Sequence, residues 1–303
     1  MRIVFTGATS FTGMWFVKTL FQKGHEVFTP IQREKNAYEG IRKARLNEVE
    51  KSSQAVFSLP FGSEAFFDWL KGLEQIDLFC HHAADVTNYK SPDFDVIQAL
   101  ENNTKNLPLL LQILKQKGCT EIILTGSVFE PKEGQGSNHL RAVSPYGLSK
   151  GLTTECFKYY CEKEELELKH FVIPNPFGPY EEFRFTSFLA KSWLEGKTPS
   201  VTHPSYVRDN VPVTLLAEAY ARFIEDHTPK LSPSYFNGSQ EEFVRRFQKE
   251  MEPRLQVPCE VIIEKQKDFS EPLIRTNLDP ITINWNESAF WDNLAKFYNK
   301  YYR

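Results

Sequence analysis

Residues 1–16 read MRIVFTGATSFTGMWF, and this stretch decides the fold. An apolar run ends at Gly7, and apolar residues with helical spacing follow Gly13. A strand, a tight turn and a helix start in this order form an anion site, because the first N–H groups of a helix have no carbonyl partners. Ser10 takes the place of the usual middle glycine, which costs little only if its φ is negative. The stretch predicts a phosphate-binding turn that includes a candidate hydroxyl ligand on Ser10; its residues are Gly7, Thr9, Ser10, Phe11 and Gly13.

The segments that follow alternate between strand-like and helix-like patterns. Apolar runs predict strands at 25–31, 55–59, 76–83, 121–127 and 169–173. Helical patterns lie between the later runs, at 63–73, 94–118 and 144–168, and Pro108 should kink or break the second of them. Strands separated by helices predict an α/β fold of the Rossmann type, a doubly wound parallel sheet covered on both faces.

The composition of the chain changes after residue 173. Segments 174–183, 196–212 and 227–239 are rich in proline and glycine, with short helical patterns between them. We therefore predict a dinucleotide-binding domain at 1–173 and a smaller C-terminal α+β substrate domain at 174–303. Part of 205–236 could return to the first domain.

The composition of the chain argues against several classes of partner. A net charge of −3 over 303 residues gives no general attraction to phosphate polymers, so we expect no nucleic-acid partner. No apolar run approaches the ~18 residues of a membrane span and no targeting segment opens the chain, so we expect a cytoplasmic protein with no membrane partner. Histidines and cysteines lack the spacing of metal ligands, so we expect no metal site.

The segment SPYGLSK at 144–150 places Tyr146 and Lys150 four residues apart near the start of a predicted helix. This spacing puts both side chains on one face, about one turn apart. A neighbouring ammonium favours the phenolate, so Lys150 should lower the pKa of Tyr146 toward the range useful for proton transfer. Alone, such a pair usually marks a solvated helix face, and its context decides between the two interpretations.

The context is a series of short motifs along most of the chain. They are TGATSFTG at 6–13, HHAA at 81–84, Asn103, TGSVFEP at 125–131, YGLSK at 146–150, NPFGP at 175–179, RDNVPV at 208–213 and FNGS at 236–239. In this order and at these separations, the chain resembles the extended short-chain dehydrogenase/reductase family, in particular its nucleotide-sugar epimerases, dehydratases and reductases.

The resemblance implies a nicotinamide cofactor and a catalytic set. Tyr146 would be the acid or base on a sugar oxygen, Lys150 would bind the nicotinamide ribose, and Asn103 would support the proton relay. Thr125 would hold the reacting oxygen, since the family's catalytic hydroxyl lies three residues before the valine of this turn; Ser127 is the closest competitor. A binding module has no use for such a set, which argues against a non-catalytic cofactor-binding scaffold.

The same resemblance implies further binding residues. Ala83 and Ala84 would line the cofactor site next to the phosphate-binding turn. The substrate would be a nucleotide-diphosphate sugar, with Asn175 and Arg208 at the diphosphate, a task that suits the fixed fork of donors on arginine. Arg184, like Ser127, is a weaker candidate for this pocket.

Residues that this chain lacks argue against two of the family's reactions. The family's 4,6-dehydratases carry Asp-Glu directly after the catalytic threonine, where this chain has Gly126 and Ser127. Reductases that also epimerise use a cysteine and a histidine, where this chain has Ser127 and Ser187. Two reactions remain: reduction of a nucleotide-linked 4-keto-6-deoxy sugar for surface-polysaccharide precursors, which we favour, and NAD-dependent 4-epimerisation.

The end of the second predicted strand bears on the cofactor. NAD-binding relatives have an aspartate there for the adenosine ribose, but this chain has Ile31 and Gln32, followed by Arg33 and Lys35. A missing carboxylate with nearby cations favours a 2′-phosphate, so we expect NADP(H) with Arg33 as a ligand and keep NAD(H) open. We also expect a homodimer, through the helices that contain Asn103 and Lys150, as in most relatives.

Overall fold

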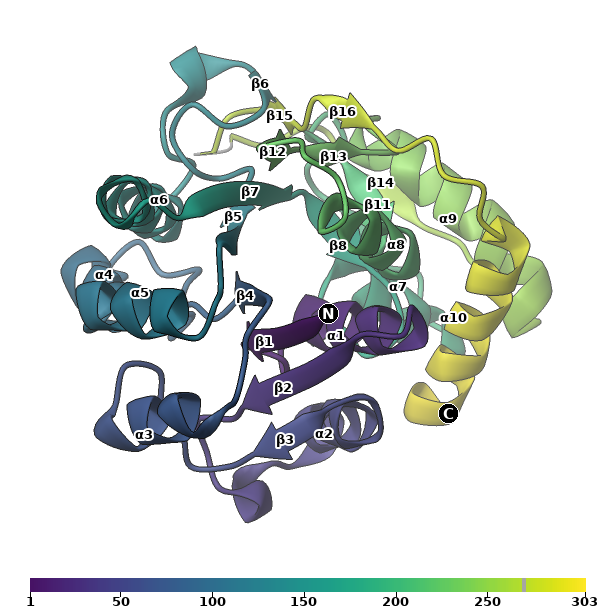
Figure 1. Ribbon diagram of the computed structural model, residues 1–303. Coiled ribbons are helices and arrows are strands. Elements are labelled where there is room, and N and C mark those ends of the chain that lie inside the picture. The colour runs from purple at the N-terminus through teal and green to yellow at the C-terminus, as the bar shows by residue number, and fades with distance from the viewer. Residues whose placement is uncertain (269–270) are drawn as a thin grey trace.

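The structure is a computed structural model that describes residues 1–268 and 271–303, and within them a seven-stranded sheet forms the centre (Figure 1). Its strand order is β12-β7-β5-β4-β1-β2-β3, and every neighbouring pair is parallel. The strands are β1 (Arg2–Thr6), β2 (Glu26–Pro30), β3 (Gln54–Val56), β4 (Leu78–His81), β5 (Glu121–Ser127), β7 (Glu167–Ile173) and β12 (Lys230–Leu231). The strand order reverses between β1 and β4, which is where such sheets bind ligands.

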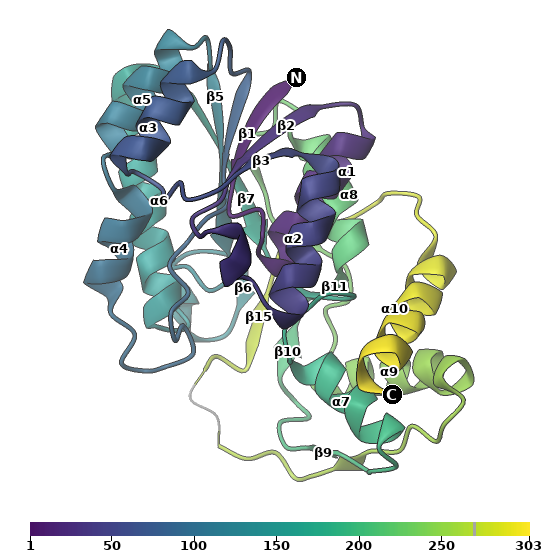
Figure 2. The same cartoon turned by 90° about the horizontal axis from the view of Figure 1, so that it is seen from below.

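Helices cover both faces of this sheet (Figures 1 and 2). One face carries α1 (Phe11–Gln22), α2 (Gly40–Ser52) and α8 (Val213–Phe223). The other carries α3 (Glu64–Gly72), α4 (Val96–Thr104), α5 (Leu107–Gln116) and α6 (Pro145–Glu164). The predicted doubly wound parallel fold is confirmed.

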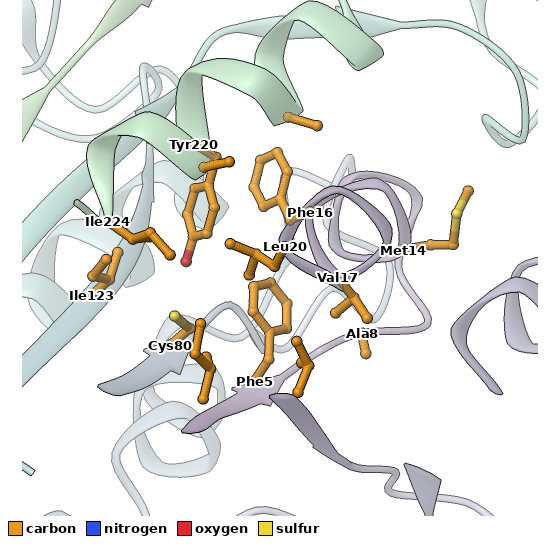
Figure 3. Packing of buried hydrophobic residues seen from close by; sticks show 14 of the residues in the cluster. Phe5, Ala8, Met14, Phe16, Val17, Leu20, Cys80, Ile123, Tyr220 and Ile224 are labelled. Carbon is orange, nitrogen blue, oxygen red and sulfur yellow. The ribbon is translucent and has the colours of Figure 1, made fainter. Parts of the chain in front are cut away.

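Aromatic packing fixes the start of the chain in the sheet. Ile3, Val4 and Phe5 of β1 are fully buried, as expected for a central strand covered on both faces. On the α1 side, Phe16 stacks on Tyr220 of α8 with ring centroids 4.2 Å apart, and Phe5 meets both rings edge-on (Figure 3). This contact holds the N-terminal end of α1 above the carboxyl end of β1.

Pro108 breaks the long predicted helix, as expected. The helix α4 ends at Thr104, Asn106 adopts a left-handed φ of 55°, and α5 begins at Leu107 with the proline in its first turn. Proline fits there because the first turn needs no backbone donor.

A second lobe lies beside the α1 face of the sheet (Figures 1 and 2). Its core is made by α7 (Phe185–Leu194), α9 (Gln240–Leu255) and α10 (Glu287–Tyr302), which bury a cluster containing Trp193, Phe247 and Trp291. The segment that forms α8 and β12 belongs to the first sheet and the helices that cover it. This segment lies within 205–236, the part of the chain that could return to the first domain. The division into domains at residue 173 stays a prediction.

Short strands connect the two parts. A three-stranded sheet is ordered β10-β15-β6, and β8 pairs with β11. The short strands are β6 (Gln135–Gly136), β8 (Asn175–Phe177), β9 (Ser200–Val201), β10 (Val207–Arg208), β11 (Asn210–Pro212), β13 (Pro233–Ser234), β14 (Ile262–Ile263), β15 (Ile274–Thr276) and β16 (Asp279–Pro280). Within the described ranges, no helix is both long and apolar enough to cross a bilayer.

Candidate active site

The glycine-rich turn between β1 and α1 requires both of its glycines. Gly7 has a φ of +75°, and a Cβ on it would lie 2.7 Å from the amide nitrogen of Ala83. A Cβ on Gly13 would lie 2.3 Å from the carbonyl oxygen of Gly7. The turn is therefore pressed against the residues that follow β4, where a cofactor crosses between the two strand ends in this kind of fold.

Ser10 meets the condition set by its sequence position. Its φ is −71°, which any residue adopts without strain, and its Oγ accepts the Gly13 N–H at 3.1 Å as the N-cap of α1. The hydroxyl is thus already engaged as a helix cap. The phosphate-binding capacity of the turn comes from its backbone, since the amides of Phe11 and Thr12 begin the helix and have no carbonyl one turn back.

The predicted catalytic residues come from three elements. Ser144 caps α6 by accepting the Gly147 N–H, which sets Tyr146 in the first turn of the helix. One turn on, Lys150 Nζ donates to the carbonyl oxygen of Thr125 at 2.7 Å, so the structure brings these two residues into direct contact. Asn103 is buried behind them.

Asn103 ties the loop after β4 to α6. Its Oδ1 accepts the Asp85 N–H at 2.7 Å, and its Nδ2 donates to Thr153 Oγ1 at 3.3 Å. Through these bonds, Asn103 fixes the helix that carries Tyr146 and Lys150. Asn103 thus supports the helix that carries the tyrosine, and these two bonds do not reach the tyrosine itself.

The Tyr146 ring packs edge-on against Tyr89 at 5.5 Å and Phe94 at 6.0 Å, two residues of the loop after β4. Burial raises the pKa of Tyr146, the charge of Glu130 raises it further, and Arg184 lowers it. The expectation that Lys150 lowers this pKa is wrong in this structure, because burial dominates and the ammonium is directed at the Thr125 carbonyl. The phenol is held in its protonated form.

A buried carboxyl that no sequence pattern singled out lies beside these residues. Glu130 is 1% exposed; its carboxylate accepts the Ser127 N–H at 2.7 Å and the Thr154 hydroxyl at 2.9 Å. Burial raises its pKa, and its charge in turn raises the pKa of Lys150, which burial lowers. Ser127 itself closes the turn, with its Oγ accepting the Phe129 N–H at 3.2 Å.

Gly126 has no room for a side chain. A Cβ there would lie 2.0 Å from His170 Nε2 and 2.7 Å from Glu130 Oε1. The aspartate that family dehydratases carry after their threonine could not be placed here without displacing His170. An aspartate at this position would thus carry a steric cost.

Arg208 is less open than its predicted role requires. It is 3% exposed, stacks on Tyr206 at 3.6 Å, and donates to the carbonyl oxygens of Val207 and Pro272 and to the Glu271 carboxylate. The segment before β15 thus takes up most of the donors of Arg208, and its contact with a diphosphate stays a prediction. Its Nε is buried and has no hydrogen-bond partner among the described residues.

Arg275 lies next to it and escaped the sequence analysis. The two arginines are register partners on β10 and β15. Arg275 Nε donates to the Val128 carbonyl at 2.9 Å and Nη2 to the Glu130 carbonyl at 2.7 Å, while Nη1 is buried without a partner in the described ranges. The two buried arginines thus lie side by side, each with one buried nitrogen that has no hydrogen-bond partner among the described residues.

The other two substrate candidates differ in position. Asn175 is exposed, and its Nδ2 donates to Asn210 Oδ1 at 2.7 Å across the β8–β11 pair. Arg184 precedes α7, with its guanidinium 6.0 Å from the Phe11 ring, and its charge acts on Tyr146. Arg184 thus connects the start of α1 to the tyrosine.

The end of β2 carries no carboxylate. Ile31 is 2% exposed and belongs to the core, whereas Gln32 and Arg33 are exposed. Lys35 forms an ion pair with Glu50, and Arg33 forms none among the described residues. Arg33 is therefore a cation without an ion pair, among the described residues, at the end of β2, where the adenosine ribose of a dinucleotide would bind.

His82 belongs to the HHAA motif, but the sequence assigned it no role of its own. Its ring packs against Phe5 and Phe16, with centroids 5.4 and 5.3 Å away. Its Nε2 is 3.0 Å from Ser10 Oγ and 3.1 Å from Thr12 Oγ1, and its Nδ1 is 3.0 Å from Thr125 Oγ1. The imidazole therefore joins the glycine-rich turn to the predicted catalytic threonine.

Comparisons with known proteins agree on the family and the fold. A family model described as NAD dependent epimerase/dehydratase family matches residues 3–237. No curated protein matches the sequence significantly. The fold is similar to that of a Thermotoga maritima UDP-glucose 4-epimerase solved with UDP-glucose, at 15% identity and a TM-score of 0.76 over 99% of each chain.

Two further solved structures share the fold. A Bacillus cereus UDP-glucuronic acid 4-epimerase with UDP-glucuronic acid and NAD has 16% identity and a TM-score of 0.73 over 99% of each chain. A Streptomyces venezuelae dTDP-glucose 4,6-dehydratase with NAD has 17% identity and a TM-score of 0.74 over 99% of this chain and 97% of that one. At these identities, the likeness establishes the shared fold alone.

Proposed function

The chain belongs to the NAD dependent epimerase/dehydratase family, and from this premise we propose that it reduces the keto group of a nucleotide-linked 4-keto-6-deoxy sugar with NADPH. Such a reaction would serve the synthesis of surface-polysaccharide precursors. The observation that carries the choice of cofactor and reaction is the end of β2, where a buried Ile31 replaces the ribose-binding carboxylate and Arg33 is free to meet a 2′-phosphate.

The residues of the cofactor site fit a dinucleotide. The cradle of Gly7 and Gly13 would be filled by a Cβ at either position, so the backbone can approach a pyrophosphate closely. The amides of Phe11 and Thr12 would hold that pyrophosphate at the start of α1. Ala83 and Ala84 follow β4 beside Gly7, Thr9 lies in the turn, and Lys150 would bind the nicotinamide ribose.

The arrangement of the catalytic residues suits reduction. When bound, the reduced nicotinamide supplies a hydride to the carbonyl carbon. Tyr146 donates its proton to the carbonyl oxygen, and its raised pKa keeps the phenol in the form that a proton donor needs. The Thr125 hydroxyl donates a hydrogen bond to the same oxygen, while Asn103 holds the two helices that support the site.

The surroundings of Tyr146 support the choice of sugar. Tyr89 and Phe94 form an apolar wall beside the phenol, which suits the methyl group of a 6-deoxy sugar more than a hydroxymethyl group. Arg208 and Arg275 place two buried positive charges side by side, which would attract a diphosphate, and Asn175 lies on β8, which pairs with β11, the strand that follows Arg208. Arg184 would bind on the Tyr146 side of the site.

The experiment follows absorbance of NADPH after addition of a dTDP- or UDP-linked 4-keto-6-deoxyhexose. Consumption of NADPH by the wild type is expected, and Tyr146→Phe should lower kcat at least about a hundredfold with an unchanged dissociation constant for NADPH. Tyr301→Phe, an exposed tyrosine on α10 away from the proposed site and the proposed dimer contact, is the control. Full activity of Tyr146→Phe would overturn the mechanism.

Two other outcomes would reject the reductase, and a third would reject the choice of cofactor. Interconversion of UDP-glucose and UDP-galactose on tightly retained NAD would make the protein a 4-epimerase. Binding of a nicotinamide cofactor without turnover of any nucleotide sugar would favour a cofactor-binding scaffold. Clearly tighter binding of NADH than of NADPH would reject the cofactor assignment.

A homodimer through α4 and α6 is part of the proposal. These helices pack together on the molecule's flank and leave Ile97 71%, Tyr159 64% and Leu152 36% exposed. Apolar side chains at such exposure favour burial against a second copy. Light scattering should give twice the mass of the chain, and Ile97→Glu should give the mass of one chain.

A further inference from the structure

His82 has no role in the reaction as proposed above, yet its imidazole joins two parts of the site. The backbone of this residue is fixed, since Thr6 Oγ1 accepts the N–H groups of His82 and Ala83, each at 3.2 Å. The ring packs against both Phe5 and Phe16. Its two nitrogens therefore have set directions, one toward α1 and one toward β5.

The imidazole is neutral. Burial, with a smaller effect from the charge of Lys150, lowers the pKa of His82 to about 3. A neutral imidazole carries a proton on one nitrogen and a lone pair on the other, so one side of the ring donates and the other accepts.

The hydroxyl groups at Nε2 decide which side donates. Two hydroxyl groups lie at Nε2, the nearer being Ser10 Oγ at 3.0 Å; a lone pair on Nε2 can accept from both hydroxyls, whereas an N–H there could be donated well to only one. Thr12 Oγ1, at 3.1 Å, can donate to the same lone pair. Nε2 is therefore the acceptor, which leaves the proton on Nδ1, and Nδ1 donates to Thr125 Oγ1 at 3.0 Å.

We propose that His82 is a positioning residue that donates its Nδ1–H to Thr125 Oγ1 and thereby directs the Thr125 proton to the reacting sugar oxygen. This inference rests on the proposed function of Thr125. With Nδ1–H occupying one lone pair of Oγ1, the threonine keeps its own proton to donate. The opposite tautomer would take that proton from Thr125 and leave only lone pairs facing the carbonyl oxygen.

The chain of hydrogen bonds also has a direction. It runs from Ser10 at the start of α1, through His82, to Thr125 at the end of β5. The first residue lies where the pyrophosphate would bind and the last where the sugar would react. His82 thus couples the position of the cofactor turn to the orientation of the catalytic hydroxyl.

The first test measures the tautomer on the unmodified protein, through nitrogen chemical shifts of its histidines labelled with ¹⁵N. Histidine-by-histidine replacement assigns the signals. His82 should be neutral at pH 7 with the proton on Nδ1, and Thr125→Val should shift the Nδ1 signal. A proton on Nε2 would overturn the inference. This measurement needs no substrate, so it stands even if no nucleotide sugar is turned over.

The second test uses three replacements. His82→Leu removes both links and should lower kcat about tenfold, with KM and the NADPH dissociation constant within about twofold. His82→Asn can keep a donor at the position of Nδ1 and should recover most of kcat, whereas His82→Gln, whose amide reaches toward Nε2, should not. Equal loss in all three variants would contradict a role through Thr125.

A double-mutant cycle completes the test. In a Thr125→Val background, His82→Leu should change kcat by less than about twofold, because the group through which it acts is gone. If the two losses multiply instead, His82 acts independently of Thr125 and the inference fails. Circular dichroism of each variant separates loss of the fold from loss of positioning.

Discussion

Lys150 Nζ lies 2.7 Å from the carbonyl oxygen of Thr125, so a buried ammonium on α6 is tied to the end of β5. The amine was expected to act on Tyr146, one turn earlier on the same helix. In the structure it instead fixes the distance between the helix that carries the phenol and the strand that carries the catalytic hydroxyl. This bond therefore joins the elements that carry both groups of the proposed reaction, together with the bond from Thr154 on α6 to Glu130.

Lys150→Met should lower kcat at least about a hundredfold, because the ribose ligand and the tie between α6 and β5 are lost together. Consumption of NADPH with the keto-sugar nucleotide measures the effect. Lys158→Met is the matched control, since Lys158 lies two turns further along α6, is exposed and pairs with Glu155. A kcat for Lys150→Met within about threefold of the wild-type value would exclude the lysine from the mechanism.

Gly126→Ala should destabilise the fold by about 1–3 kcal/mol, because the new methyl group would overlap the His170 ring and the Glu130 carboxylate. Urea unfolding measures the loss. The control is Gly72→Ala in α3, where a Cβ would meet nothing within 4 Å. Equal stability of Gly126→Ala and the wild type would show that His170 moves aside freely, and the steric argument against a dehydratase would fail.

The sheet could be predicted because its strands are buried on both faces and read as continuous apolar runs, as Ile3, Val4 and Phe5 do. The helix α2 was not predicted. Few of its residues are buried, and they include Arg45, whose guanidinium donates to the Tyr180 carbonyl and to Glu182. Because α2 buries a charged side chain against a distant loop, its sequence shows no helical pattern of apolar residues.

Some residues of the site could likewise be predicted from the sequence, and others could not. Tyr146 and Lys150 share one helix, and Gly7 and Gly13 share one turn, so local spacing was enough to single them out. The arrangement of Arg208 depends on Glu271, and that of Arg275 depends on Val128, 147 residues away in the chain. Contacts between such distant segments carry no local pattern, so their partners had to come from the structure.

Arg33→Ala should raise the dissociation constant for NADPH about tenfold and leave that for NADH unchanged, because only NADPH carries the 2′-phosphate that the exposed guanidinium would bind. Quenching or enhancement of nicotinamide fluorescence measures both constants. Lys35→Ala is the matched control, since Lys35 is already paired with Glu50. A parallel loss for both cofactors would remove Arg33 from the 2′-phosphate site.

A buried carboxyl in the second lobe should make stability depend on pH. Burial raises the pKa of Glu181 to about 7, and its carboxyl accepts hydrogen bonds from Thr186 and, at 3.0 Å, from Tyr298. The folded protein therefore holds a proton on Glu181 that the unfolded chain, with an ordinary pKa of 4.5, has lost. The unfolded state binds fewer protons between these two values, so stability falls as the pH rises through them.

The expected loss between pH 4.5 and about 7 is about 3 kcal/mol, the free energy of a shift of this size. Glu181→Gln carries no titrating group at this place, so the wild-type free energy of unfolding minus that of the variant should fall by this amount over the interval and stay constant above it. Urea unfolding at a series of pH values gives the difference, in which the other titrating groups cancel. A flat difference would mean that Glu181 is ionised in the folded protein, and the carboxyl would then need a cation that Arg184, the nearest guanidinium acting on it, would have to supply.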